Sequence, residues 1–300
     1  ITNSTDGVLD LNVDGFTLGP NSVGTQSMEI NKSGQSYVSY GWKAGGTAVS
    51  NSDGTITSTV SADQNYGFSV VSATAPSSNT SFSLGHGLNA VPKLIIFRQR
   101  ASSNWAVYHS GLASAETKYL RLNSTNAAGT SNVWNDTAPT SSVFSSAMSG
   151  NWDLGADLIA YCWSEVSGFS KMGTYAGSSS AVTVNTGFAP KFILIKSNDT
   201  AGQEWIIKDK TLGFDKYLMP NNSDAEATGR NVTFNSDGFT VDSGQGPTNW
   251  SGRNYIYVAF ADSPANNFTP HNIITEENTS AKNNFAPLTW TGNGTARYCH

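Results

Sequence analysis

The chain has 300 residues, a formal net charge of −5 and only 13% charged residues. Its negative charge argues against nucleic-acid binding, which normally needs a basic surface to neutralise phosphates. No apolar run approaches the roughly 20 residues that a membrane helix requires, so we expect no membrane insertion. Strong helix formers are scarce, whereas β-branched and turn residues abound, and this balance favours an all-β protein with a surface of Ser, Thr, Asn and Gly.

Two apolar segments near the N-terminus, a short one after an Asp-Gly turn and a longer one ending in Trp42, have the pattern of β-strands. The pair returns twice along the chain, ending in Trp163 and then in Phe260. The three pairs are 16–18 with 37–42, 143–144 with 158–163, and 239–241 with 255–260. This recurrence indicates a repeated structural unit, of which residues 1–43 supply only the second half.

Residues 43–65 separate this half-unit from the next repeat. They are rich in Gly, Ser and Thr, with Ile56 and Val60 as their few apolar anchors. Such a composition is typical of a linker or of a connection that contains a strand. We therefore predict a partial β unit and linker over residues 1–65.

The first half of the unit contains the clearest duplication. Both copies have a Pro-Lys pair, an apolar strand, a polar turn and a second strand that begins with Trp105 or Trp205. This order is the pattern of a β-hairpin. Upstream of each hairpin lies a Gly-Phe-Ser segment, which aligns Phe68 of the first copy with Phe169 of the second.

Together these recurrences predict an all-β fold of duplicated antiparallel β-sandwiches, with partial units at both ends. The chain has room for two sandwiches of about a hundred residues each, which we place over residues 66–165 and 166–262. Residues 263–300 then form a linker, broken by Pro264 and Pro270, and the start of a further partial unit. Because a half-unit cannot bury its apolar face alone, either the two chain ends meet or adjoining sequence completes each of them.

No residue pattern predicts catalytic chemistry. The carboxylates lie mostly beside turn residues, with no pair spaced as in a glycosidase, and no Gly-x-Ser-x-Gly elbow accompanies any of the four histidines. The Asp-Gly turns lack the alternating acids of a calcium loop, which leaves bound calcium undecided, and Cys162 and Cys299 do not have metal-ligand spacing. We therefore predict no catalytic residues, no metal ligands and no cofactor.

Three tryptophans lie in polar segments rich in Gly, Asn and Ser, where an exposed ring is expected. They are Trp134, Trp152 and Trp250. Exposed aromatic rings among short polar side chains suit the binding of sugars, so these residues are the candidate ligand-binding residues. The alternative is that they close the ends of the sandwiches as packing residues or lie buried in subunit interfaces.

Several motifs point to a family. They are Tyr37-Val38-Ser39-Tyr40-Gly41-Trp42, Gly85-His86-Gly87-Leu88, Val107-Tyr108-His109, Lys118-Tyr119-Leu120 and Gly168-Phe169-Ser170-Lys171. With them the chain resembles, over about residues 14–262, a repeat domain in large virion proteins of marine tailed phages, including those of cyanobacteria. The resemblance implies a lectin-like β-sandwich of the concanavalin type, a jelly roll, in a tail fibre or other virion appendage.

From this resemblance we expect a structural or adhesive component of the extracellular phage particle. The first hypothesis is a tail fibre or receptor-binding protein that contacts glycans on the host surface. The alternatives are a non-catalytic capsid decoration, head-fibre or other structural protein, and a polysaccharide depolymerase. The expected partners are other virion subunits, a host surface glycan and further copies of the chain, with a trimer as the favoured homo-oligomer.

Overall fold

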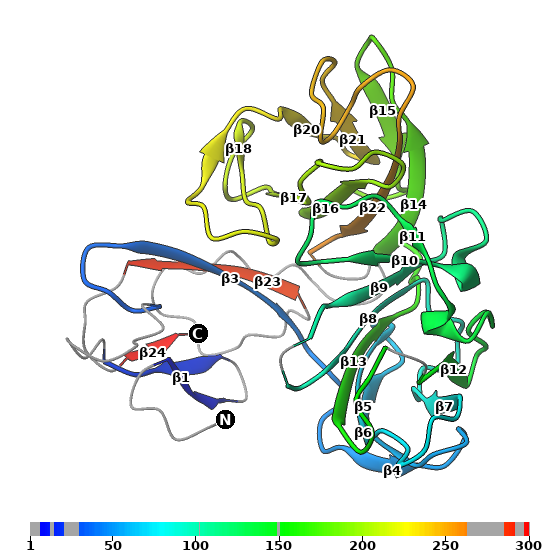
Figure 1. Cartoon of the computed structure of the whole chain (residues 1–300). Helices are drawn as coiled ribbons and strands as arrows, with labels where there is room; N and C mark the ends of the chain where they lie inside the picture. The colour runs from blue at the N-terminus through cyan, green and yellow to red at the C-terminus, as the bar shows by residue number, and fades with distance from the viewer. Residues whose placement is uncertain are drawn as a thin grey trace. The chain divides into compact units, whose positions relative to one another are not determined.

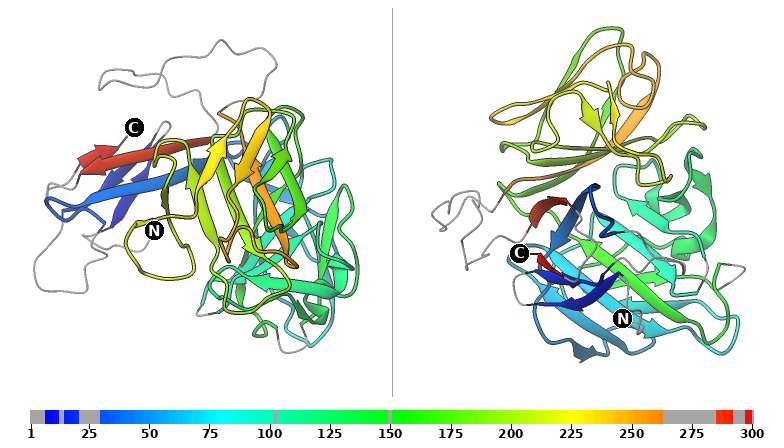
Figure 2. Two further views of the ribbon diagram at one scale, coloured as in Figure 1. Left: turned by 90° about the horizontal axis from the view of Figure 1, so that it is seen from above. Right: turned by 90° about the vertical axis from the view of Figure 1, so that its left-hand side faces the viewer.

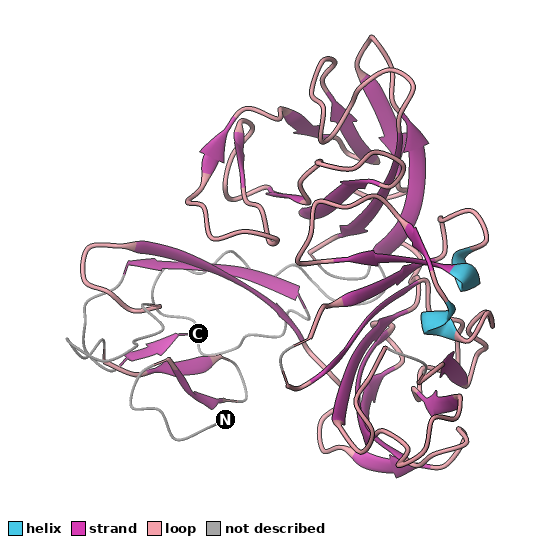
Figure 3. Ribbon diagram, viewed as in Figure 1, coloured by secondary structure: helices cyan, strands magenta, loops and turns pink. Residues whose placement is uncertain are grey.

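The structure is a computed structural model that describes residues 7–12, 15–20, 30–101, 103–148, 151–262, 285–291 and 297–299. In these ranges the regular structure is antiparallel β-strand with two short 3-10 helices (Figure 3). The prediction of an all-β fold made of antiparallel β-sandwich units is therefore confirmed. No helix in the described part is long and apolar enough to span a membrane.

The chain folds into two compact units. The smaller contains residues 1–42 and 268–300, and the larger contains residues 43–267 (Figure 1). The segment over residues 43–65, predicted as a linker or strand-bearing connection, carries two strands and is part of the larger unit. These strands are β4 (Val49–Asn51) and β5 (Ser58–Asp63).

The smaller unit is built from strands of both chain ends. Its longest strands, β3 (Ser36–Trp42) and β23 (Phe285–Thr291), form an antiparallel ladder that sets Trp42 opposite Phe285. Figure 2 shows these two strands side by side in both views. A second sheet joins β1 (Val8–Leu11), β2 (Phe16–Leu18) and β24 (Arg297–Cys299). The two ends of the chain therefore meet, which was the first of the two alternatives for the half-units.

Within the larger unit, residues 66–165 together with β4 and β5 form a sandwich that we call repeat 1. Its main sheet has the order β11-β10-β9-β8-β13-β6-β5-β4, and a small sheet pairs β7 with β12. The new strands are β6 (Phe68–Thr74), β7 (Phe82–Gly85), β8 (Leu94–Gln99), β9 (Ala106–His109), β10 (Lys118–Arg121), β11 (Gly129–Thr130), β12 (Val143–Ser146) and β13 (Asp157–Trp163). Phe97 of the main sheet packs on Phe144 of the small one, with ring centroids 5.3 Å apart, so the core lies between the two sheets.

Residues 166–262 form the second sandwich, repeat 2, on the same plan. Its main sheet has the order β14-β22-β16-β17 and continues through a bridge between Ile207 and Leu218 to the pair β18 and β19, while β15, β21 and β20 form the second sheet. The strands are β14 (Ser170–Ala176), β15 (Val182–Asn185), β16 (Phe192–Ser197), β17 (Ile206–Asp209), β18 (Lys216–Tyr217), β19 (Ala227–Thr228), β20 (Val232–Phe234), β21 (Gly238–Val241) and β22 (Asn254–Phe260).

Strand registers show which residues of the two repeats correspond. In both hairpins, β8–β9 and β16–β17, the residue two places after the Pro pairs with the residue four places after the Trp, so Trp105 and Trp205 hold equivalent positions just before the second strand. The backbone N–H of Trp105 donates to Asn123 Oδ1 at 3.1 Å. The backbone N–H of Trp205 likewise donates to Asn221 Oδ1 at 2.9 Å. The duplication predicted from the hairpins is thus present down to single hydrogen bonds.

One alignment between the repeats is corrected by strand pairing. Trp163 lies opposite Phe68, whereas Phe260 lies opposite Ser170. The counterpart of Phe68 is therefore Ser170 rather than Phe169, and the alignment on the Gly-Phe-Ser segments was one residue out of register. β6 begins at the Phe of its Gly-Phe-Ser segment, whereas β14 begins one residue later, at the Ser, and a shift of one residue in a strand exchanges the two faces.

The two repeats meet inside the larger unit at His109, at the end of β9. The side chain is fully buried, and Nε2 lies 3.0 Å from the carbonyl oxygen of Tyr257 in repeat 2. Burial lowers the pKa of His109 to about 4, so the ring is neutral at pH 7. Its Nδ1 accepts a hydrogen bond from the Gly111 N–H at 3.0 Å, which leaves Nε2 to donate to Tyr257.

Candidate functional site

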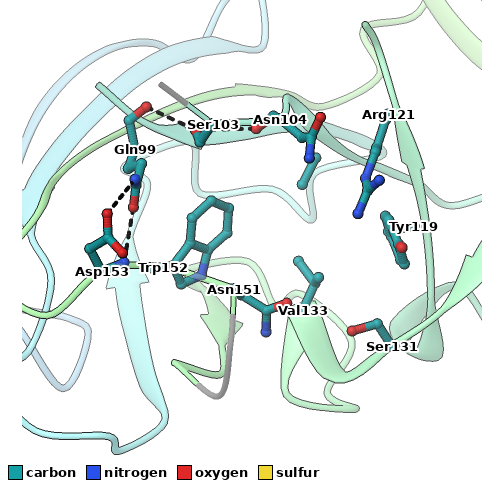
Figure 4. Close-up of a pocket in the computed structure, with 11 residues that line it drawn as sticks. Gln99, Ser103, Asn104, Tyr119, Arg121, Ser131, Val133, Asn151, Trp152 and Asp153 are labelled. Atoms are coloured by element: carbon teal, nitrogen blue, oxygen red, sulfur yellow. Dashed lines mark hydrogen bonds between the residues drawn. The ribbon is translucent and has the colours of Figure 1, made fainter. Parts of the chain in front are cut away.

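A pocket of about 360 Å³ opens in repeat 1 (Figure 4). It is bounded by β8, β9 and β10 of the main sheet, by the 3-10 helix η2 (Asn132–Trp134), and by residues 151–153. This volume falls within the range of about 300 to 1,000 Å³ that is usual for small-molecule sites. The pocket is therefore large enough for a small ligand or for one end of a longer one.

One wall of the pocket is the edge of Trp152. The ring is only 8% exposed, and its centroid lies 4.5 Å from that of Phe97 in the core. Its Nε1 donates to Ser146 Oγ at 2.8 Å, and Ser146 Oγ donates to the Val133 carbonyl oxygen at 2.7 Å. With its indole N–H satisfied and its body packed, Trp152 forms a rigid aromatic surface beside the opening.

A second wall is polar and is held by a pair of hydrogen bonds. Gln99 Nε2 donates to Asp153 Oδ2 at 2.8 Å, and the Asp153 N–H donates to Gln99 Oε1 at 2.9 Å. Ser103 Oγ donates to the Gln99 carbonyl oxygen at 3.1 Å. These bonds fasten the 151–153 loop to β8 and place the Asp153 carboxylate at the pocket.

Across the pocket lie Tyr119 and Arg121, which are two residues apart on β10 and so project from the same face. The Arg121 guanidinium carbon is 5.4 Å from the centre of the Tyr119 ring. Figure 4 shows Trp152 between these two residues and the Gln99–Asp153 pair. Gly129, paired with Tyr119, leaves room for that ring, since a Cβ there would lie 2.8 Å from Tyr119 Cε1.

The lining combines aromatic surface with donors and acceptors of short reach. Asn104 is positioned by Asn123, whose Nδ2 donates to Asn104 Oδ1 at 3.1 Å. Asn151 is held by a bond from its Nδ2 to the Ala147 carbonyl oxygen at 3.0 Å. Together with the guanidinium, the carboxylate and the hydroxyl of Ser131, these amides can hydrogen-bond a ligand rich in hydroxyl groups.

The structure separates the three predicted tryptophans. Trp134 is 1% exposed, donates from Nε1 to the Lys118 carbonyl oxygen at 2.9 Å, and packs on Tyr108 with centroids 5.6 Å apart. The expectation that Trp134 and Trp152 are exposed was wrong, because both rings fold under the sheet and find partners for their N–H groups. Trp250, in repeat 2, is 49% exposed as expected. Of the three, Trp152 alone lines the pocket.

Four further lining residues had no signal in the sequence taken as a single chain. They are Gln99, Tyr119, Arg121 and Asp153. A comparison of the repeats contains a signal for the pocket: repeat 1 has Ala106 where repeat 2 has Ile206, and Arg121 where repeat 2 has Met219. Repeat 1 thus has a small and a charged residue where repeat 2 has two bulky apolar ones, and this difference leaves space for the pocket in repeat 1.

Other titratable groups have structural partners. His86 is buried, its Nε2 lies 3.2 Å from the Thr140 carbonyl oxygen, and burial lowers its pKa. Burial raises the pKa of the Cys162 thiol, which keeps it protonated and unreactive. Neither residue lines the pocket. Among the described residues, no group of three or more His, Cys, Asp or Glu side chains could hold a metal ion.

Fold and pocket together define an all-β protein of two sandwich repeats, the first of which carries a polar pocket with aromatic walls. The chain belongs to the family described as Domain of unknown function (DUF7483), whose model matches residues 1–264. No curated protein and no solved structure matches the chain.

Proposed function

We propose that this chain is a structural and adhesive component of a tailed-phage virion, a tail fibre or receptor-binding protein that binds glycans on the host surface through the repeat 1 pocket. The observation that carries this proposal is the pocket itself, with its aromatic walls and its positioned amide, guanidinium and carboxylate groups. The resemblance of residues 14–262 to repeat domains of marine phage virion proteins supports the same reading.

A glycan would meet groups that are already in place. Tyr119 offers apolar ring surface for the C–H face of a sugar and the edge of Trp152 borders it, while Arg121 and Asn104 offer hydrogen bonds to its hydroxyls. The Gln99–Asp153 bonds hold the loop before any ligand arrives. Such preorganisation reduces the entropy lost on binding, which matters for a ligand as hydrophilic as a sugar.

Binding rather than cleavage fits the lining best. Asp153 is the one carboxylate among the pocket-lining residues, and its Oδ2 is engaged by Gln99. A glycosidase needs two carboxyl groups facing each other across the scissile bond, one of them protonated. A depolymerase would release reducing sugar from host polysaccharide, and we expect none.

A purely structural role in the particle is the second candidate. It is favoured by the burial of Trp134, Trp152 and Trp205, which contribute to packing within and between the repeats. In either role the partners are other virion subunits and further copies of the chain, with a trimer as the favoured symmetry, and the location is the virion.

The test compares Arg121→Ala with Met219→Ala on a glycan array and by calorimetry with the polysaccharide that scores highest. Met219 holds the position in repeat 2 that Arg121 holds in repeat 1, so it controls for truncation of a long side chain. We expect Arg121→Ala to weaken binding about tenfold or more, as for a lost charged hydrogen bond, and Met219→Ala to leave it unchanged. Absence of glycan binding by the parent protein, or equal effects of the two variants, would count against the pocket and favour the structural role.

A further inference from the structure

The outer face of the main sheet in repeat 2, turned away from the sandwich core, is covered. Six of its side chains are at most 8% exposed; they are Met172, Leu194, Lys196, Trp205, Ile256 and Val258. Part of the cover is the loop that follows β10 in repeat 1. Trp205 Nε1 donates to the Arg121 carbonyl oxygen at 2.9 Å, and Lys196 Nζ lies 3.3 Å from the Thr125 carbonyl oxygen.

Backbone contacts complete this junction between the repeats. The Ala128 N–H donates to the Asn198 carbonyl oxygen at 2.8 Å, and the Gly202 N–H donates to the Thr125 carbonyl oxygen at 3.0 Å. The loop over residues 121–128 of repeat 1 thus sits on the outer face of repeat 2. Figure 1 shows β10 and β11 of repeat 1 beside β16 and β22 of repeat 2.

The same face of repeat 1 is not covered to the same degree. The counterparts of these six residues are half-buried, although Val107 and His109 on the same face are buried; the six are Val70, Ile96, Arg98, Trp105, Ile159 and Tyr161. The Arg98 guanidinium carbon lies 4.4 Å from the centre of the Trp105 ring, and Trp105 stacks on Tyr161 with centroids 6.4 Å apart. Tryptophan, tyrosine and arginine are the residue types that contribute most to protein–protein interfaces.

The counterpart of the covering loop is exposed in repeat 2. It spans residues 219–226, and residues 220 and 222–226 are exposed. Because the 121–128 loop of repeat 1 contacts repeat 2 while its counterpart, the 219–226 loop, is exposed, the relation between the repeats is not a two-fold rotation. If the rotation and shift that relate repeat 1 to repeat 2 are applied again to repeat 2, the 219–226 loop points away from repeat 1 of its own chain and toward a different molecule.

Charged residues on these two surfaces differ from those at the existing junction. The loop of repeat 2 carries Asp224 and Glu226, which replace the uncharged Asn126 and Ala128 of the repeat 1 loop, and Glu226 pairs with Lys216 at 2.8 Å. The outer face of repeat 1 carries an exposed Arg100 where repeat 2 has the uncharged Asn198, and opposite it an exposed Asp157 where repeat 2 has Asn254. In the existing junction Ala128 bonds to Asn198, so the corresponding contact between two copies brings Glu226 to Arg100.

We propose that the outer face of repeat 1 binds the 219–226 loop of a second copy of this chain, reproducing between molecules the junction that joins the repeats within one. Such a contact is head-to-tail, because different surfaces of the two copies meet. It closes into a ring if the rotation between copies allows closure and continues as a filament if it does not. It does not depend on the glycan pocket, which lies on the inner side of the sheet.

The test uses the full chain and two charge reversals, Arg100→Glu on the face and Asp224→Lys with Glu226→Lys on the loop. Sedimentation velocity over a wide range of concentration measures association. We expect the parent protein to form species heavier than the monomer, and each variant alone to associate about tenfold more weakly or not at all, since like charges then meet. Mixing the two variants restores opposite charges at each contact between unlike copies, and is expected to restore association.

Asp237→Lys is the control, because it reverses an exposed acid of repeat 2 outside the loop, and we expect it to associate like the parent protein. Near-native circular dichroism and unfolding midpoints for all variants exclude misfolding as the cause. A parent protein that stays monomeric at every concentration would overturn the proposal and leave another virion protein as the occupant of the face. Association that neither reversal weakens, or that mixing does not restore, would overturn it as well.

Discussion

The indole N–H of Trp205 in repeat 2 donates to the backbone carbonyl oxygen of Arg121 in repeat 1, across 2.9 Å. The bond joins two sandwiches that otherwise have separate cores. Its donor is 1% exposed, whereas its counterpart in repeat 1, Trp105, is half-buried. Trp105 and Trp205 make the same backbone hydrogen bond, but only the ring of Trp205 is covered by the other repeat. We therefore expect the two side chains to contribute unequally to stability.

That difference predicts unequal costs of truncation. Trp205→Ala should lower the free energy of unfolding by about 3 to 5 kcal/mol, as expected for a buried Trp, and Trp105→Ala by no more than about 1 kcal/mol. Urea unfolding monitored by circular dichroism measures both. Losses of the same size in the two variants would show that the junction between the repeats does not stabilise the protein.

His109 predicts a dependence of stability on pH. An unfolded histidine binds a proton near pH 6.5, whereas burial at the junction lowers the native pKa to about 4. Between these values the unfolded state binds more protons, so stability is retained above pH 6.5 and lost as the pH falls toward 4. The loss should reach about 3 kcal/mol, at 1.36 kcal/mol for each unit of pKa shift.

Carboxylates also titrate in this range, so the measurement is a comparison with His109→Gln, whose amide can donate to Tyr257 without taking up a proton. The difference between the unfolding free energies of the parent protein and of His109→Gln should change between pH 6.5 and pH 4 and stay constant above pH 7. A difference that is flat across the whole range would mean that His109 is solvated in the native protein.

Trp134 and Trp250 test the distinction between packing and exposed rings. Trp134→Ala removes a buried ring and the partner of the Lys118 carbonyl oxygen, and should cost about 3 to 5 kcal/mol. Trp250→Ala removes a ring that is 49% exposed and should change stability by about 1 kcal/mol or less. Thermal unfolding of both variants measures this. If Trp250→Ala weakens glycan binding while leaving stability intact, a sugar site exists on repeat 2 as well.

The bonds between Gln99 and Asp153 predict a separable effect on binding. Gln99→Ala releases the 151–153 loop from β8, so glycan affinity should fall about tenfold. The free energy of unfolding should fall by about 1 to 2 kcal/mol, because two hydrogen bonds are lost. Ser197→Ala, at the equivalent buried position of repeat 2, is the matched control and should leave affinity unchanged. Unaltered affinity in Gln99→Ala would indicate that the loop holds its place without the bonds.

The hairpins could be predicted from the sequence because their information is local. Trp105 and Trp205 can be aligned from the sequence, because each follows a Pro-Lys pair and an apolar run and begins the next strand. The alignment of Phe68 with Phe169 failed because β14 begins at the Ser of the motif and β6 at the Phe, so the same motif is paired one residue apart in the two repeats. A strand register depends on the partner strand, and the partner of β14 lies about eighty residues further along the chain.

The burial of Trp134 and Trp152 could not be predicted from their polar neighbours. Each ring reaches an acceptor, the Lys118 carbonyl and the Ser146 hydroxyl, that only the folded loop brings near. The pocket was missed for a related reason, since it joins side chains from β8, β10 and two loops that no short motif unites. Differences between aligned repeats, such as Arg121 against Met219, carry that information better than either copy alone.

The pairing of β3 with β23 has a practical consequence for shortened versions of the protein. A fragment that ends before Phe285 leaves β3 without its neighbour, and the bare strand edge invites aggregation. Residues 43–262, by contrast, are one uninterrupted stretch that holds both sandwiches, the pocket and the junction. Anyone who trims the polypeptide for biophysical work should therefore remove the two ends together rather than one at a time.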